Sequence, residues 1–117
     1  MHVAMISDEE SAGGAAIAAS RLATGFRGAA AEVTRIVARP DGQQHPWTTM
    51  PLFASRTAWL IRRLQTSVQR RMRISLATLD RATVYMHLRN ILESIQPDVI
   101  NIHNIHGAQL PPAVVSV

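Results

Sequence analysis

The sequence contains no cysteine and no lysine. Without cysteine the chain can form no disulfide, no thiolate metal site and no cysteine nucleophile. Its twelve basic residues are all arginine, and they give a formal net charge of +4 and an isoelectric point near 11.3. Such a charge favours anionic partners. Aromatic residues make up only 4% of the chain and do not alternate with arginine. Proteins bind single-stranded nucleic acid by stacking its bases on aromatic side chains, so nucleic acid is not an expected partner.

Long apolar runs are also missing. No run approaches the ~18 residues that a membrane span needs, and the first residues lack the basic start and apolar core of a secretory signal. We therefore expect a cytoplasmic protein that reaches the inner face of the plasma membrane only as a peripheral protein. With 117 residues, the chain has room for one domain, 1–117.

The pattern of apolar residues predicts an α/β fold with a Rossmann-like, partial parallel sheet and flanking helices. The apolar run His2–Ile6 indicates a buried strand, the alanine-rich segment Ala15–Phe26 a helix, and the β-branched segment Glu32–Ala38 a second strand. This order is that of a βαβ unit. The expected apolar face of the helix carries Ala18, Leu22 and Phe26.

The second half of the chain predicts two more helices and one more strand. Pro40–Ser55 contains several prolines and is expected to be an irregular loop. An amphipathic helix is expected from Arg56, and a further helix from about Arg81 that ends before Pro97. A third buried strand, Val99–Ile102, follows. The apolar faces of the helices carry Leu60, Ile61, Leu64, Val68, Met72 and Leu76 in the first, and Val84, Leu88, Ile91, Leu92 and Ile95 in the second.

Two polar loops follow predicted strands. Ligands of open α/β sheets bind beyond the carboxyl ends of the strands, and the usual strand order would place the strand at Val99 beside the first one. The loops Ser7–Gly14 and His103–Gly107 would then open onto one crevice. Gly13 and Gly14 would let backbone amides approach a phosphate or carboxylate at a helix N-terminus, or would simply form a tight turn. The dinucleotide fingerprint GxGxxG is absent.

His103 and His106 stand three residues apart, which raises the question of a metal site. Zinc would require a third ligand, and the remaining histidines are expected in a strand, a loop and a helix that do not converge. We therefore expect no metal there. The two open readings are a hydrogen-bonding role in the crevice and a loop without function.

Four arginines are expected on the polar side of the helix that begins at Arg56, namely Arg62, Arg63, Arg70 and Arg73. Such a helix most often has a simply solvated face. The sharper reading is an anion-binding surface for phospholipid headgroups or nucleic acid.

The segments SAGGAAIAASRL (11–22) and PDVINIHNIHG (97–107) together resemble the amino-terminal part of bacterial family 4 glycosyltransferases, which have the GT-B fold. The resemblance implies retaining transfer of a sugar from a nucleotide-sugar donor to a glycan acceptor, often lipid-linked, in polysaccharide biosynthesis. It implies no cofactor. The residues that match the substrate-binding loops of the family are Gly13, Gly14, His103, Asn104, His106 and Gly107.

The same resemblance implies a truncated domain. The family's next strand and its donor-binding carboxyl-terminal domain have no counterpart here, so we expect a fragment that is inactive alone and self-associates through an exposed sheet edge. Two other readings stay open. One is a small arginine-rich module that binds anionic membrane or nucleic acid, and the other is a partner subunit completed by another chain.

Overall fold

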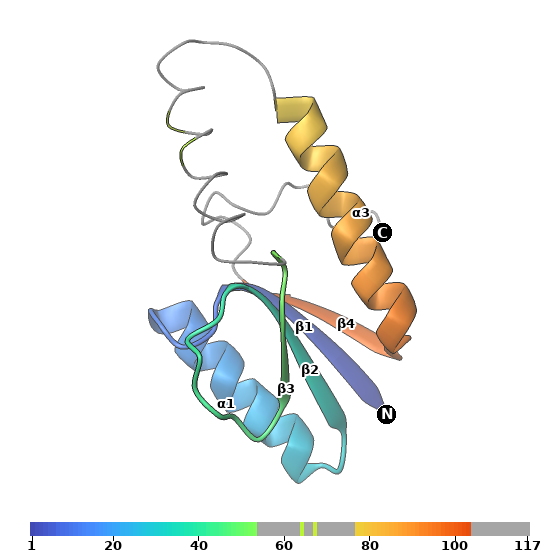
Figure 1. The fold of residues 1–117 in the computed structure, drawn as a ribbon. Helices are drawn as coiled ribbons and strands as arrows, with labels where there is room; N and C mark the ends of the chain where they lie inside the picture. The colour runs from blue at the N-terminus through green and yellow to red at the C-terminus, as the bar shows by residue number, and fades with distance from the viewer. Residues whose placement is uncertain (54–63, 65–66, 68–76, 104–117) are drawn as a thin grey trace.

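The computed structural model describes residues 1–53, 64, 67 and 77–103, and for residues 77–83 it describes the backbone alone. Six elements lie within these residues (Figure 1). In chain order they are β1 (His2–Glu9), α1 (Gly14–Gly28), β2 (Glu32–Arg39), β3 (Thr48–Pro51), α3 (Ala77–Ile95) and β4 (Val99–His103).

The four strands form one parallel sheet in the order β3-β2-β1-β4. The expected α/β class and the βαβ unit are therefore confirmed. Strand β4 pairs with β1 from Val3 opposite Val99 to Ser7 opposite His103, which is the neighbour that the strand order predicted. All four carboxyl ends consequently lie at one edge of the sheet.

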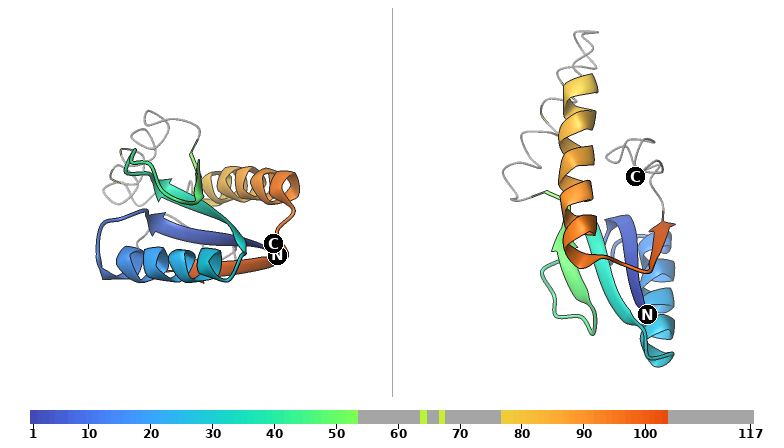
Figure 2. Two further views of the ribbon diagram at one scale, coloured as in Figure 1. Left: turned by 90° about the horizontal axis from the view of Figure 1, so that it is seen from below. Right: turned by 90° about the vertical axis from the view of Figure 1, so that its right-hand side faces the viewer.

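The two helices cover opposite faces of the sheet, as the two views of Figure 2 show. Because side chains of a strand alternate between the faces, β1 sends Val3 and Met5 into the core beneath α1, and Ala4 and Ile6 into the core beneath α3. Parallel strands covered on both sides are apolar along most of their length, which explains the continuous burial of β1 and β2.

Helix α1 packs on the sheet through alanines. Ala16, Ala19 and Ala23 are its buried residues, while Leu22 and Phe26 are partly buried and pack beside them. The prediction that Ala18 lies on the inner face was wrong, because the buried stripe runs through its neighbour Ala19 and leaves Ala18 exposed. Small side chains in this stripe allow the helix to lie close to the strands.

Helix α3 packs where its pattern predicted. Val84, Leu88, Ile91 and Leu92 are buried against the sheet. The helix begins at Ala77, earlier than the expected start near Arg81. It ends at Ile95 because Gln96 takes a left-handed backbone conformation (φ 44°) and Pro97 follows.

Two expectations for the strands were wrong. The segment Pro40–Ser55, expected to be irregular, contains β3, whose four residues pair with the outer side of β2. Prolines tolerate such an edge position, since an edge strand leaves some N–H groups unpaired. Strand β4 is not fully buried, because Val99 and Ile100 are each 43% exposed.

The arginine-bearing segment of the predicted first amphipathic helix lies outside the described residues, and so do Arg62, Arg63, Arg70 and Arg73. Leu64, which the pattern placed on the apolar face, is described and is 58% exposed. This residue therefore does not contribute to the core.

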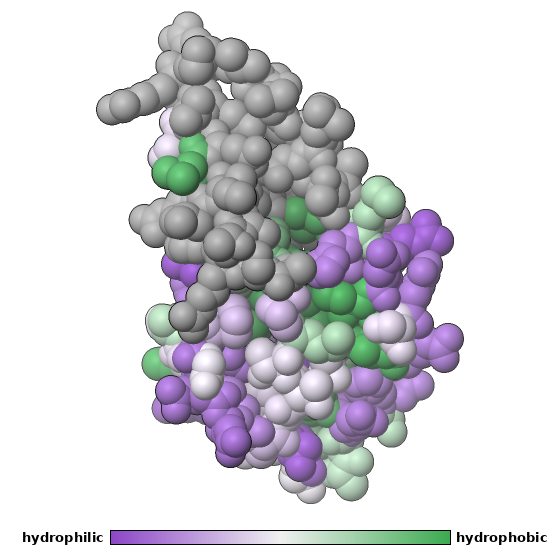
Figure 3. All heavy atoms as spheres, viewed as in Figure 1, coloured by the Kyte–Doolittle hydropathy of each residue, from purple (hydrophilic) through white to green (hydrophobic). Residues whose placement is uncertain are grey.

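Apolar residues gather between α3 and the sheet. On the face seen in Figure 3, hydrophobic residues show in the middle of the described part and hydrophilic residues form its margins. Among the described helices, none has the length and hydropathy to span a membrane.

Candidate functional site

The edge at the carboxyl ends of β1 and β4 brings the first residues of the two predicted loops, Ser7 and His103, side by side. His103, the last residue of β4, pairs in register with Ser7 of β1, and the N-terminus of α1 follows β1 by a short loop. Residues in register on neighbouring parallel strands point to the same face, so His103 and Ser7 both face α1.

Of the two glycines at the start of α1, Gly13 has a structural role. Gly13 is the N-cap residue and has φ 88° and ψ 163°, a conformation that side-chain-bearing residues rarely adopt. Its carbonyl oxygen accepts the first helical hydrogen bond, from Ile17 N at 3.0 Å. A Cβ atom at Gly14 would meet no other atom of the described residues within 4 Å, so these residues leave space beside this helix end.

Strand β4 presents polar atoms to the α1 side. Asn101 Oδ1 and His103 Nε2 are buried atoms that have no hydrogen-bond partner among the described residues. Buried polar atoms normally have partners, so these two atoms are exceptions within the described part of the chain. The other predicted residues of this loop, Asn104, His106 and Gly107, lie outside the described residues.

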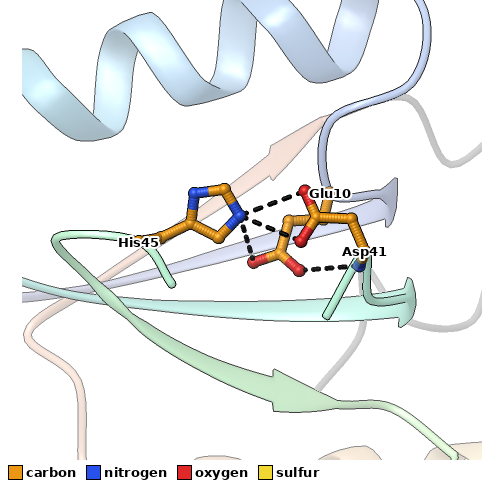
Figure 4. A group of neighbouring side chains, drawn as sticks. All are labelled: Glu10, Asp41 and His45. Atoms are coloured by element: carbon orange, nitrogen blue, oxygen red, sulfur yellow. Dashed lines mark hydrogen bonds and ion pairs between the residues drawn. The ribbon is translucent and has the colours of Figure 1, made fainter. Parts of the chain in front are cut away.

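A second group of polar side chains lies at the same edge of the sheet, beyond β1 and β2 (Figure 4). It consists of Glu10, Asp41 and His45, whose ligand atoms all lie within 4.8 Å of one another. His45 Nε2 is 3.0 Å from Asp41 Oδ1, 3.1 Å from Asp41 Oδ2 and 3.7 Å from Glu10 Oε1. We call this group the Glu10–Asp41–His45 cluster.

Each carboxylate of the cluster is held by further donors. Glu10 is only 1% exposed, and its two oxygens accept from the Thr49 hydroxyl and from Asp41 N, the latter at 3.1 Å. Asp41 Oδ1 accepts from Gln43 N at 2.9 Å. These bonds fix both carboxylates toward His45.

Arg35 of β2 is buried next to the cluster and hydrogen-bonds to the main chain of Glu10. Its Nη1 donates to the Glu10 carbonyl and to the Ser20 hydroxyl, each at 2.8 Å, and its Nη2 donates to the Ser7 hydroxyl at 3.1 Å and the Glu9 carbonyl at 3.3 Å. The guanidinium is therefore occupied by carbonyl and hydroxyl oxygens. Among the described residues no hydrogen bond joins it to a carboxylate of the cluster.

Burial and charge shift two pKa values here. Burial lowers the pKa of Arg35, and the charges of Glu10 and Asp41 act against that shift. For Asp41, burial acts to raise the pKa, but hydrogen bonds from Gln43 N–H, the Ser11 hydroxyl and His45 outweigh it and hold the pKa well below its ordinary value. Asp41 is thus an anion at neutral pH.

Trp47 supports the imidazole and borders a cavity. The rings of His45 and Trp47 stack with centroids 4.8 Å apart and an interplanar angle of 7°, and the Arg35 guanidinium lies 5.4 Å from the Trp47 ring. A cavity of about 350 Å³ lies between this pair and α1. It is lined by Ser11, Ile17, Ser20, Arg21, Thr24, His45 and Trp47.

Sequence reasoning missed this cluster. The sequence places His45 in a loop without convergence with His2 and His87, and residue spacing gives no sign that two carboxylates lie beside it. His2 proves structural, since its ring bonds to Ile95 O at 3.1 Å and to Thr34 Oγ1 at 2.8 Å. The usable signal was that Glu10 and Asp41 both follow strands of one parallel pair.

Comparison of the chain with protein-family models, with curated proteins and with solved structures gives no match. The resemblance of the two sequence motifs to family 4 glycosyltransferases stays a prediction.

Proposed function

We propose that the chain forms the acceptor-side domain of a retaining glycosyltransferase, which passes a sugar from a nucleotide-sugar donor to a glycan or lipid-linked acceptor. The observation that carries the proposal is the pairing of β4 with β1, because it joins the two motifs of the resemblance at one edge of the sheet. On this proposal the donor is held by a second domain.

The chemistry of this edge suits a hydroxyl-rich acceptor. His103 Nε2 and Asn101 Oδ1 offer buried hydrogen-bonding atoms without partners among the described residues. An imidazole and an amide can both donate to and accept from sugar hydroxyls. Open space beside Gly14 leaves room for a bulky group at the positive end of the α1 dipole.

His103 is the first residue to test as a positioning or proton-transferring group. An imidazole next to a sugar hydroxyl can accept its proton as the hydroxyl attacks, provided that the two lie within hydrogen-bond reach. Loss of such a group typically costs about 10²–10⁴-fold in rate. The proposal expects a loss of this size in His103→Ala.

The test is incorporation of radiolabelled sugar from nucleotide-sugar donors into lipid-linked glycan by membranes of cells that express the complete gene. Gly14→Val fills the open space at the helix end, and His103→Ala removes the imidazole. The matched control is His87→Ala on α3, on the opposite face of the sheet. We expect both edge variants to lose transfer while the control retains it. Transfer that is equal in all four proteins, or absent from the wild type, would refute the proposal.

A further inference from the structure

We propose that Glu10, Asp41 and His45 bind a divalent transition-metal ion, with Zn²⁺ as the best fit. This site lies beyond β1 and β2, whereas the proposed acceptor edge lies between β1 and β4, so the two proposals are independent.

The donor set carries the proposal. One imidazole nitrogen and two carboxylates converge within 4.8 Å; Glu10 follows β1, and Asp41 and His45 lie four residues apart in the loop between β2 and β3. Zn²⁺ is bound by such ligands at about 2.0–2.2 Å, and open zinc sites use three protein ligands with a fourth position left for water or substrate. An imidazole among the ligands disfavours Mg²⁺ and Ca²⁺, which prefer oxygen alone.

The carboxylate oxygens around His45 Nε2 are better placed to bind a metal ion than to accept hydrogen bonds from a single N–H group. Three carboxylate oxygens from two residues lie 3.0, 3.1 and 3.7 Å from this one nitrogen. A single N–H hydrogen can satisfy one of them well. A metal ion placed among the same atoms would bond to the nitrogen and to both carboxylates together.

Each proposed ligand is held in place by further hydrogen bonds or by ring stacking, as ligands in metal sites are. Thr49 and Asp41 N orient the Glu10 carboxylate, Gln43 N orients Asp41, and the Trp47 ring holds the imidazole by stacking. Outer partners of this kind fix ligand orientation and raise metal affinity. The neighbouring cation, Arg35, is directed to carbonyl and hydroxyl oxygens and leaves the carboxylate oxygens available.

An independent observation points to a ligand next to the cluster. The indole nitrogen of Trp47 is buried and has no hydrogen-bond acceptor among the described residues. Trp47 and His45 line the same cavity of about 350 Å³. Because His45 belongs both to the cluster and to this lining, the cavity borders the cluster on its imidazole side.

The test is titration of metal-free full chain with Zn²⁺ by calorimetry, and with Co²⁺ by visible absorption. We expect about one ion per chain, a Co²⁺ spectrum typical of tetrahedral coordination, and no competition by Mg²⁺. His45→Gln and Asp41→Asn should each weaken Zn²⁺ binding by at least about tenfold, since even outer-partner changes cost 10–100-fold. The matched control, His87→Gln, should bind as the wild type does.

Folding is monitored in each variant by circular dichroism. If His45→Gln does not fold, Zn²⁺ binding by Asp41→Asn serves as the test. If neither folds, the Co²⁺ spectrum of the wild type decides. Absence of saturable Zn²⁺ binding, a Co²⁺ spectrum without nitrogen ligation, or binding unchanged in His45→Gln would overturn the proposal. Binding that is lost in His103→Gln and kept in His45→Gln would also overturn it, because the ion would then lie at β4.

Discussion

Arg35 on β2 donates a 2.8 Å hydrogen bond to the main-chain carbonyl of Glu10, the residue that follows β1. Arg35 is fully buried, so this bond links the middle of β2 to the end of β1 inside the protein. It also sets the backbone of a residue whose carboxylate faces Asp41 and His45. The fold and the proposed metal site thus depend on the same side chain.

Arg35→Met should reduce the free energy of unfolding by at least about 3 kcal/mol. Methionine fills similar space but removes the buried guanidinium and its hydrogen bonds to the Glu9 and Glu10 carbonyls and to the Ser7 and Ser20 hydroxyls. The control is Arg89→Met, which breaks only the exposed i,i+4 pair with Glu93 and should leave the free energy of unfolding nearly unchanged. Urea unfolding measures both, and equal costs would contradict the role given to Arg35.

Gly13→Ala and Gly14→Ala should differ in their effect on stability. Gly13 has φ 88°, so alanine there should cost about 1–3 kcal/mol of stability. Gly14 lies in the first turn of α1 with open space beside it, so alanine there should leave stability unchanged or raise it by up to about 1 kcal/mol. Thermal unfolding compares the two, and a larger loss at Gly14 would be against this account.

Strand β4 should make the chain self-associate. Among the described residues it pairs only with β1, so its outer edge has unpaired N–H and C=O groups next to the exposed Val99 and Ile100. Such an edge recruits other chains, and lysine on it prevents pairing. We expect Ile100→Lys to shift sedimentation toward monomer, and the control Met86→Lys on α3 to have no effect. A wild-type chain that stays monomeric at all concentrations would rule this out.

The arginine-bearing segment should bind anionic vesicles weakly. Each arginine near an anionic surface contributes about 1 kcal/mol, and salt screens that attraction. Replacing Arg62, Arg63, Arg70 and Arg73 by glutamine should therefore remove flotation with phosphatidylglycerol vesicles at low ionic strength. Flotation that is indifferent both to salt and to the substitutions would show that these arginines do not bind lipid.

The sequence predicted the helices and strands that have a strong apolar pattern. It did not predict an element that depends on contacts with residues far away in the sequence. The burial of Leu88 and the pairing of β4 with β1 followed from periodicity and from the usual strand order. Strand β3 has only four residues and ends on Pro51, too few for a pattern, and it exists because β2 offers it an edge. The mistaken placement of Ala18 arose because alanine is so frequent in α1 that several faces look alike.

The site was predictable only where chain order gives proximity. Gly13 and His103 were expected at one edge because each follows a strand of a predicted adjacent pair. The Glu10–Asp41–His45 cluster needed the path of the loop between β2 and β3, which brings His45 back toward the end of β1. Loop paths depend on contacts such as the stacking of His45 on Trp47, and residue type alone does not give them.

Binding of a glycan acceptor at the edge between β1 and β4 can be measured by NMR titration of the ¹⁵N-labelled chain with a polyprenyl-diphosphate-linked monosaccharide in detergent micelles, against empty micelles. We expect saturable shifts of the amides of Ser7, Gly14 and His103, which are lost in His103→Ala. If the shifts are absent, or fall on α3 and leave these three amides unchanged, the acceptor does not bind at this edge.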